Sequence, residues 1–124
     1  MATKPIQQLD IYKLAEKLAD YIWFAYDNWS YKVQHTIGLQ VIRSSDSISA
    51  NLAEGYGRFT VKDRNKFYLY ARGSFEETKC WLRKAIRRKI ISKKEEAIVA
   101  KLINELGPKL NSFIKKSYSL NQNS

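Results

Sequence analysis

Apolar residues recur at intervals of three and four positions along four long stretches of this chain, and this period constrains the fold more than any other feature. Side chains with this spacing lie on one face of an α-helix. The four stretches cover residues 10–28, 31–54, 61–89 and the segment that follows Ser92. Because neither an alternating strand pattern nor a tandem repeat is present, the sequence predicts an all-α protein.

The four apolar faces are the predicted core. Its members are Ile11, Leu14, Leu18, Ile22, Ala25 and Trp29, then Ile37, Val41, Ile48 and Leu52, then Phe67, Ala71, Ser74, Thr78, Trp81 and Ala85, and finally Val99, Leu102, Ile103, Leu106, Leu110 and Phe113. An up-down-up-down antiparallel four-helix bundle is the simplest way to bury four such faces. We assign the bundle to residues 10–116, an N-terminal extension to residues 1–9 and a polar C-terminal tail to residues 117–124.

Local sequence signals predict where these helices begin and end. Thr60-Val61-Lys62-Asp63 and Ser92-Lys93-Lys94-Glu95 resemble capping boxes, which mark helix N-termini. Gly55-Tyr56-Gly57 is expected to end the second helix. Pro108 has no backbone N–H for the carbonyl of Asn104, so we expect a kink or a break in the last helix.

Length and composition exclude several classes of protein. The 124 residues suffice for one domain. The chain has one Cys, Cys80, and one His, His35, which excludes an internal disulfide and a Cys-built zinc site. We expect no metal, no cofactor and no enzymatic activity. The apolar stretch 21–26 is far shorter than the about 20 residues of a membrane span, and residues 1–10 lack the apolar core of a secretory signal. A soluble cytoplasmic protein without a membrane partner is therefore expected.

Positive charge is concentrated in one part of the chain. The formal net charge is +10, and residues 58–94 contain 13 Lys or Arg against three acids, which accounts for the whole excess. Residues 79–94 carry eight basic residues and no acid. Such a field attracts polyanions, nucleic acid above all. A solvated basic face that keeps the protein soluble is the alternative interpretation.

The predicted nucleic-acid-binding residues lie on the exposed arc of the third helix and in the turns that flank it. They are Arg58, Lys62, Lys66, Arg72, Lys79, Arg83, Lys84, Arg87, Arg88, Lys93 and Lys94. Their spread around the helix suits a phosphate backbone better than one bidentate ligand. Four aromatic residues, Tyr56, Phe59, Tyr68 and Tyr70, could stack on unpaired bases, although packing is the simpler role for most of them.

Two helices carry more apolar surface than one core requires. The first has a second strip beside its core face, which includes Ala19, and the second has apolar residues nearly opposite its core face. A helix that is apolar on two faces is usually buried on two faces. We therefore predict a homo-oligomer whose interface contains Tyr12, Trp23, Tyr26, Leu39, Ile42, Ala50 and Ala53.

A line of polar residues runs along the second helix beside its core face. Either it is a polar ligand site, or it forms hydrogen bonds that fix the register of the helices, and we favour the structural role. The predicted structural network contains Arg43, Ser44, Ser47, Asn51, Glu54 and, on the third helix, Glu77.

Residues 42–55, Ile-Arg-Ser-Ser-Asp-Ser-Ile-Ser-Ala-Asn-Leu-Ala-Glu-Gly, followed by Gly57-Arg58, resemble the signature of the bacterial four-helix-bundle family, also called the large-subunit ribosomal RNA intervening-sequence proteins. Gly38-Leu39-Gln40 upstream fits the same pattern, as do Phe67, Ala71-Arg72-Gly73-Ser74 and Glu77 downstream. The resemblance extends over residues 9–114.

The resemblance implies a non-enzymatic helical bundle, often assembled as a ring-shaped homopentamer. Related bundles are accessory proteins of diversity-generating retroelements, where a basic pentamer associates with a reverse transcriptase and its template RNA. On this basis we expect a homo-oligomeric scaffold that binds structured RNA or an RNA–DNA hybrid. A protein-interaction module that docks an acidic partner is the alternative. Residues 87–91 are more basic than the family pattern, and this difference favours nucleic-acid binding. Gly107-Pro108 is a second difference, because the family helix continues through this position.

Overall fold

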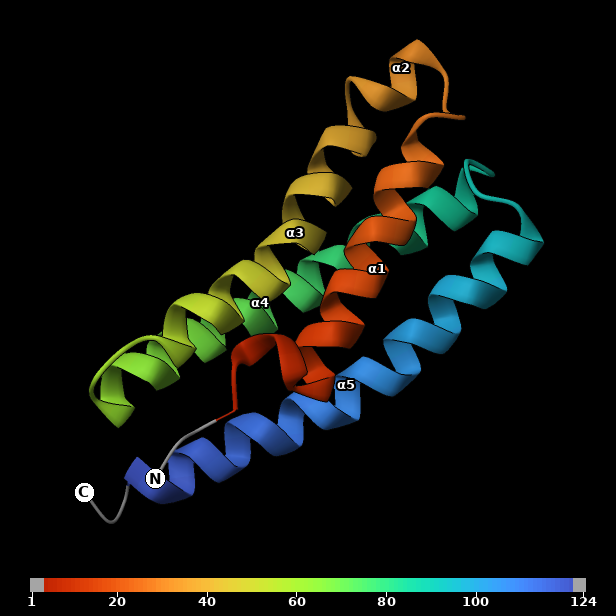
Figure 1. Cartoon of the computed structure of the whole chain (residues 1–124). Coiled ribbons are helices and arrows are strands. Elements are labelled where there is room, and N and C mark those ends of the chain that lie inside the picture. The colour runs from red at the N-terminus through yellow and green to blue at the C-terminus, as the bar shows by residue number, and fades with distance from the viewer. Residues whose placement is uncertain (1–3, 122–124) are drawn as a thin grey trace.

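The computed structural model describes residues 4–121, and all regular elements in that range are helices, as predicted (Figure 1). No strand occurs between residues 4 and 121. The elements are the short 3₁₀ helix η1 (Ile6–Gln8), α1 (Asp10–Tyr26), the single turn α2 (Tyr31–Gln34), α3 (Ile37–Tyr56), α4 (Val61–Arg87) and α5 (Lys93–Asn121).

The four long helices are α1, α3, α4 and α5, and successive ones run in opposite directions (Figure 1). α3 packs on α1 and α4, and α5 packs on the same two helices from the other side, so α1 and α4 lie diagonally across the core. The surface of α4 that faces away from α1 is therefore on the outside of the bundle. α5 packs beside α4 along this side.

The predicted apolar faces form the core. Leu18, Ile48, Leu52 and Leu106 have no accessible surface at all. On α4, however, the buried face lies closer to Tyr68, which is 3% exposed, than to the predicted Phe67, which is only partly buried. No helix within the described part of the chain is both long and apolar enough to cross a membrane.

The second predicted helix is broken near its start, so its continuity from residue 31 was predicted wrongly. Thr36 leaves the helical region, with φ −128° and ψ −103°, and α3 begins after it. The break brings the two segments close together, because a Cβ on Gly38 would lie 2.7 Å from the carbonyl oxygen of Val33. Gln34 holds α2 to α1 by donating a 2.9 Å hydrogen bond to the carbonyl of Tyr26.

The helix starts follow the predicted capping signals. At α5, the amide of Glu95 donates to Ser92 Oγ at 3.1 Å and the amide of Ser92 donates to Glu95 Oε1 at 2.8 Å, which is the reciprocal pattern of a capping box. At α4, Thr60 Oγ1 accepts from the amide of Asp63 at 3.1 Å.

α3 ends within the predicted Gly55-Tyr56-Gly57 segment, at Tyr56 with Gly57 as its C-cap, and Gly55 still lies inside the helix. A Cβ at Gly55 would lie 2.8 Å from the ring of Tyr68 and 3.0 Å from the carbonyl oxygen of Arg64. The missing side chain thus permits a close approach of α3 to α4. Gly73, by contrast, has nothing within 4 Å of its would-be Cβ, so no close approach requires glycine there.

Two expectations for the last helix are corrected. The break at Pro108 does not occur, because α5 continues across it, held by the fully buried Leu106 and Leu110 on either side. The polar tail does not begin at residue 117 either. Ser117 is buried and its hydroxyl donates to Asn65 Oδ1 on α4, which anchors the final turns of α5. Residues 122–124 of the expected tail and residues 1–3 of the expected extension lie outside the described residues.

Candidate functional site

The predicted basic residues line the outer surface of α4 and both of its ends. Arg58 lies in the turn before α4, Arg88 follows its last turn, and Lys93 and Lys94 begin α5. Nine of the eleven side chains are exposed, and Lys79 and Lys84 are half-buried. We call these eleven residues the α4 basic surface. Its remaining members, all on α4, are Lys62, Lys66, Arg72, Arg83 and Arg87.

Two cations of the α4 basic surface pair with carboxylates within the described residues. Arg58 Nη2 lies 2.6 Å from Glu54 Oε1, and Lys79 Nζ lies 2.7 Å from Glu76 Oε2. Both pairs are largely solvent-accessible and contribute little to stability. The structure records no carboxylate partner for the other nine, so most of the predicted positive charge remains available to an anion.

Aromatic rings orient several of these cations. The guanidinium of Arg58 stacks 4.7 Å from the centre of the Phe67 ring, and Lys84 Nζ lies 5.2 Å from the Trp81 ring. Trp81 is itself fixed, because its Nε1 donates to Glu77 Oε2 at 3.0 Å. The side chains of Arg58 and Lys84 are thus partly pre-organised.

The aromatic residues considered for base stacking differ sharply in exposure. Tyr68 lies in the core at 3% exposure, which removes it as a candidate. Phe59, at the turn between α3 and α4, is 98% exposed, and Tyr70 is 50% exposed. Tyr56 is partly buried, and its hydroxyl donates a 2.5 Å hydrogen bond to the carbonyl of Lys4.

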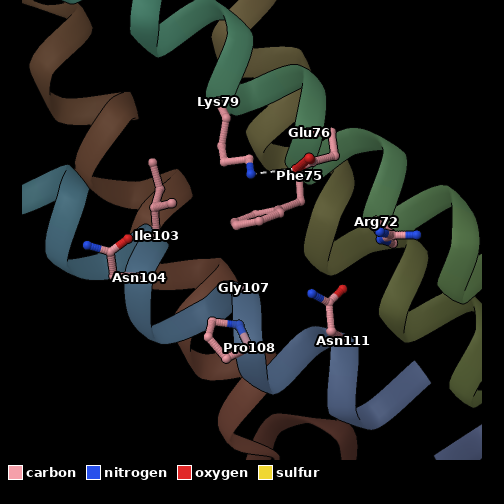
Figure 2. Close-up of a pocket in the computed structure, with 9 residues that line it drawn as sticks. All are labelled: Arg72, Phe75, Glu76, Lys79, Ile103, Asn104, Gly107, Pro108 and Asn111. Atoms are coloured by element: carbon pink, nitrogen blue, oxygen red, sulfur yellow. Dashed lines mark ion pairs between the residues drawn. The ribbon is translucent and has the colours of Figure 1, made fainter. Parts of the chain in front are cut away.

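A groove between α4 and α5 adjoins the α4 basic surface (Figure 2). Its volume is about 390 Å³, and it is lined by Arg72, Phe75, Glu76, Lys79, Ile103, Asn104, Gly107, Pro108 and Asn111. Figure 2 shows Phe75 extending from α4 toward α5, with the Lys79–Glu76 pair above it and Asn111 pointing toward α4. We call this hollow the α4–α5 groove.

Our interpretation of the sequence did not identify the two asparagines of this groove. Asn104 and Asn111 are seven residues apart, which is two helical turns and places them on one face of α5. The seven-residue spacing was the signal in the sequence that could have placed both asparagines on one helix face. We did not use it because Pro108, which lies between them, was expected to interrupt the helix.

The polar line on α3 forms hydrogen bonds chiefly within its own helix. Ser47 Oγ donates to the carbonyl of Arg43 at 2.8 Å, and Asn51 Nδ2 donates to the carbonyl of Ser47 at 2.8 Å. Ser44 alone of the six predicted network residues bonds across helices, where it accepts from Thr78 Oγ1 at 2.9 Å. Glu77 bonds to Trp81 on its own helix, so these residues do not form one continuous network.

A contact between α1 and α3 was not predicted. Ser49 Oγ donates to Glu16 Oε2 at 3.0 Å, and hydrogen bonding to the same carboxylate raises the pKa of Tyr12. Partial desolvation raises the pKa of the Asp46 carboxyl, which is otherwise exposed, and the nearby charges of Glu16 and Asp20 raise it further. Acidic groups therefore gather along the α1–α3 edge of the bundle.

Some of the predicted interface residues lie at the surface of the protomer, and the others are partly buried within it. Leu39, Ile42 and Ala50 line one shallow depression on α3, together with Arg43, Asp46 and Ser47. Trp23 is 55% exposed on α1, and the neighbouring Phe24, which was not predicted, is 67% exposed.

The other interface candidates are already partly buried within the protomer. Tyr26 lies against Gly38 and edge-on to Trp29, while Tyr12 and Ala53 are partly buried. Ala19, expected in the outer strip of α1, is 2% exposed and belongs to the protomer interior.

Comparisons with known proteins agree with this fold. The family model described as "23S rRNA-intervening sequence protein" matches residues 7–112. Among solved structures, the chain is similar to a protein of unknown function from the S23 ribosomal protein family of Bacteroides thetaiotaomicron VPI-5482. The TM-score is 0.75 at 24% identity, covering 85% of this chain and 98% of the other. That likeness concerns the fold alone. No curated protein matches the chain.

Proposed function

This chain belongs to the 23S rRNA-intervening sequence protein family, and we propose that it is a non-enzymatic, homo-oligomeric scaffold that binds nucleic acid through the α4 basic surface. Structured RNA or an RNA–DNA hybrid is the proposed ligand. The observation that carries this proposal is the exposure of eight cations that have no carboxylate partner in the described structure. Lys and Arg neutralise phosphates and release counterions, which is the main source of sequence-independent affinity.

The proposed assembly is a ring-shaped homopentamer. The exposed apolar surface at Trp23 and Phe24 on α1, and the depression that contains Leu39 and Ile42 on α3, support burial against another copy. Phe24 lines a hollow between α1 and α5, and the depression lies on α3, so neither surface contains a residue of the α4 basic surface. Several copies of a basic surface on one particle would raise the avidity for a long polyanion.

The proposed cellular role follows from the family resemblance, because related bundles include accessory proteins of retroelement reverse transcriptases. We propose that the protein holds template RNA beside such an enzyme, in the cytoplasm. Copurification of a reverse transcriptase with the tagged protein, dependent on RNA, would support this role. Recovery of an acidic protein partner after nuclease treatment would instead favour a protein-interaction module.

A salt titration of RNA binding tests the central claim. The variant Arg83→Ala/Arg87→Ala/Arg88→Ala should keep its helical circular dichroism, because all three side chains are exposed. If each contacts one phosphate, the slope of log affinity against log salt should fall by about 3. The control is Lys17→Ala/Lys101→Ala/Lys116→Ala, which removes the same charge from exposed positions that line hollows on the α1–α5 side. Equal effects of the two triple variants, or no binding at low salt, would reject the proposal.

A further inference from the structure

The α4–α5 groove is lined by five polar or charged side chains around three apolar ones, Phe75, Ile103 and Pro108. Phe75 is 5% exposed and Ile103 is half-buried, and these two side chains form the floor. The volume of about 390 Å³ lies within the range of about 300–1,000 Å³ typical of ligand sites. A second hollow shares Lys79, Ile103 and Asn104 with the first, so the groove continues along the two helices toward Arg83.

Charge on the α4 side of the groove favours an anionic ligand. Lys79 and Glu76 form a neutral pair at 2.7 Å, and Arg72 then remains as a cation without a recorded carboxylate partner. Arg72, Lys79 and Arg83 follow one another over eleven residues of α4, a distance of about 16 Å at 1.5 Å per residue. Glu96 is the acid at the far end, in the second hollow. The end that contains Arg72 is therefore the more favourable place for a phosphate.

The α5 side offers groups of a different kind. Asn104 and Asn111 are exposed at the rim, and each primary amide presents a donor and an acceptor together. That combination matches the edge of a nucleobase, whereas a carboxylate ligand would use the donors alone. Because Pro108 has no N–H, the carbonyl oxygen of Asn104 lacks its usual helical donor and is an additional backbone acceptor.

Gly107 keeps the groove open where α5 passes Phe75. A Cβ at this position would lie 3.3 Å from the ring of Phe75, closer than an ordinary van der Waals contact. With glycine there, the edge of the aromatic ring and the face of Pro108 line the same hollow (Figure 2). The apolar side chains of Phe75 and Pro108 thus lie beside the amide groups that would contact the edge of an unpaired base.

We propose that the α4–α5 groove binds an unpaired nucleotide of the bound nucleic acid, with its phosphate at Arg72 and its base edge at Asn104 and Asn111. This inference rests on the proposed nucleic-acid binding and adds to it a preference for unpaired over paired segments. Paired bases cannot present their edges to a groove of this size, so duplex RNA would contact the α4 basic surface alone.

The test compares two labelled RNAs with equal numbers of phosphates, a hairpin with an unpaired loop and a fully paired duplex. The wild type should bind the hairpin more tightly. Asn104→Ala/Asn111→Ala should lose at least about fivefold in hairpin affinity and little in duplex affinity. Both asparagines are exposed, so the variant should fold normally. The control Asn28→Ala removes an exposed amide outside the groove.

A second measurement reports contact with the base itself. A 2-aminopurine in the hairpin loop should change its fluorescence on binding to the wild type and to Asn28→Ala, and much less on binding to the double variant. Equal binding of hairpin and duplex, with no effect of the double variant, would overturn the groove inference and leave the proposed function standing. Failure of the wild type to bind either RNA would overturn both. Binding of an acidic peptide to the wild type but not to the double variant, with equal hairpin affinity of the two proteins, would assign the groove to a protein partner and overturn the inference.

Discussion

Ser44 on α3 and Thr78 on α4 share a 2.9 Å hydrogen bond between their hydroxyl groups in the interior of the bundle. Thr78 has no accessible surface and Ser44 is 4% exposed. Thr78 Oγ1 also lies 2.8 Å from the carbonyl of Ser74, so its single proton is shared between this carbonyl and Ser44 Oγ. A buried polar pair of this kind fixes the register of two packed helices more than it adds stability.

Thr78→Val should destabilise the protein by about 1–2 kcal/mol, because it leaves the hydroxyl of Ser44 buried without this partner. The double variant Ser44→Ala/Thr78→Val should lose less than the sum of the two single changes, because each single change already removes the bond between the two hydroxyls. Urea unfolding of the four proteins completes the double-mutant cycle. Strict additivity would show that the hydroxyls do not interact.

Gly55 and Gly73 give opposite predictions for the same substitution. Gly55→Ala should destabilise the bundle by about 1–3 kcal/mol, because the new Cβ would lie 2.8 Å from the ring of Tyr68. Gly73→Ala should stabilise it by about 0.5–1 kcal/mol, because alanine favours a helix interior and the site is open. Thermal unfolding of both variants checks the pair. A stabilised Gly55→Ala protein would contradict the close approach of α3 to α4.

The periodic pattern was sufficient to predict the four long helices, because most of the stabilising burial in a bundle occurs at positions three and four apart. It was insufficient at Thr36, where the break depends on Gly38 contacting the Val33 carbonyl. It also misplaced the end of α5, because Ser117 appears polar in the sequence and is buried only through its bond to Asn65 on another helix.

The basic surface could be predicted because Lys and Arg clustered on one helix are exposed almost regardless of tertiary detail. The α4–α5 groove could not be predicted in this way. It requires Phe75 on one helix and Gly107 on another to meet, and a single sequence carries no signal for that distance. Pairing within the surface, such as Lys79 with Glu76, likewise depends on rotamers rather than on composition.

Lys89 holds a backbone conformation that normally belongs to glycine. Its φ is 58°, in the left-handed region, and it follows α4 in a helix-ending motif closed by bonds from Ile90 to Ala85 and from Lys89 to Ile86. Lys89→Gly should therefore raise the free energy of unfolding by about 1 kcal/mol. Lys89→Ala is the control, because it removes the same charge and keeps the strain. Equal effects of the two variants would assign the gain to charge.

The raised pKa of Asp46 predicts a pH dependence of stability. The folded state binds this proton more tightly than the unfolded chain does, so protonation of Asp46 stabilises the fold. This contribution is complete below the ordinary Asp pKa of about 3.9 and is lost as the pH rises through the higher folded-state value.

Asp46→Asn keeps the side chain neutral at every pH. Its melting temperature should exceed that of the wild type near neutral pH, and the difference should shrink as the pH falls through the acidic range. Glu105→Gln, exposed on α5, removes one charge away from this edge and serves as the control. A pH-independent difference between Asp46→Asn and the wild type would exclude desolvation and the charges of Glu16 and Asp20 as its cause.

Glu76 and Glu77 are adjacent acids on α4 that should affect nucleic-acid binding differently. Glu76 neutralises Lys79 at the groove, whereas Glu77 accepts a hydrogen bond from Trp81. Glu76→Gln should therefore release a cation to the ligand, tighten RNA binding and steepen the salt dependence by about 0.7 for one added single-strand phosphate contact. Glu77→Gln changes the net charge equally but frees no cation. Salt titrations of both variants against the same hairpin RNA provide the measurement. An equal gain in both would mean that net charge alone governs affinity, and that Lys79 has no specific role at the groove.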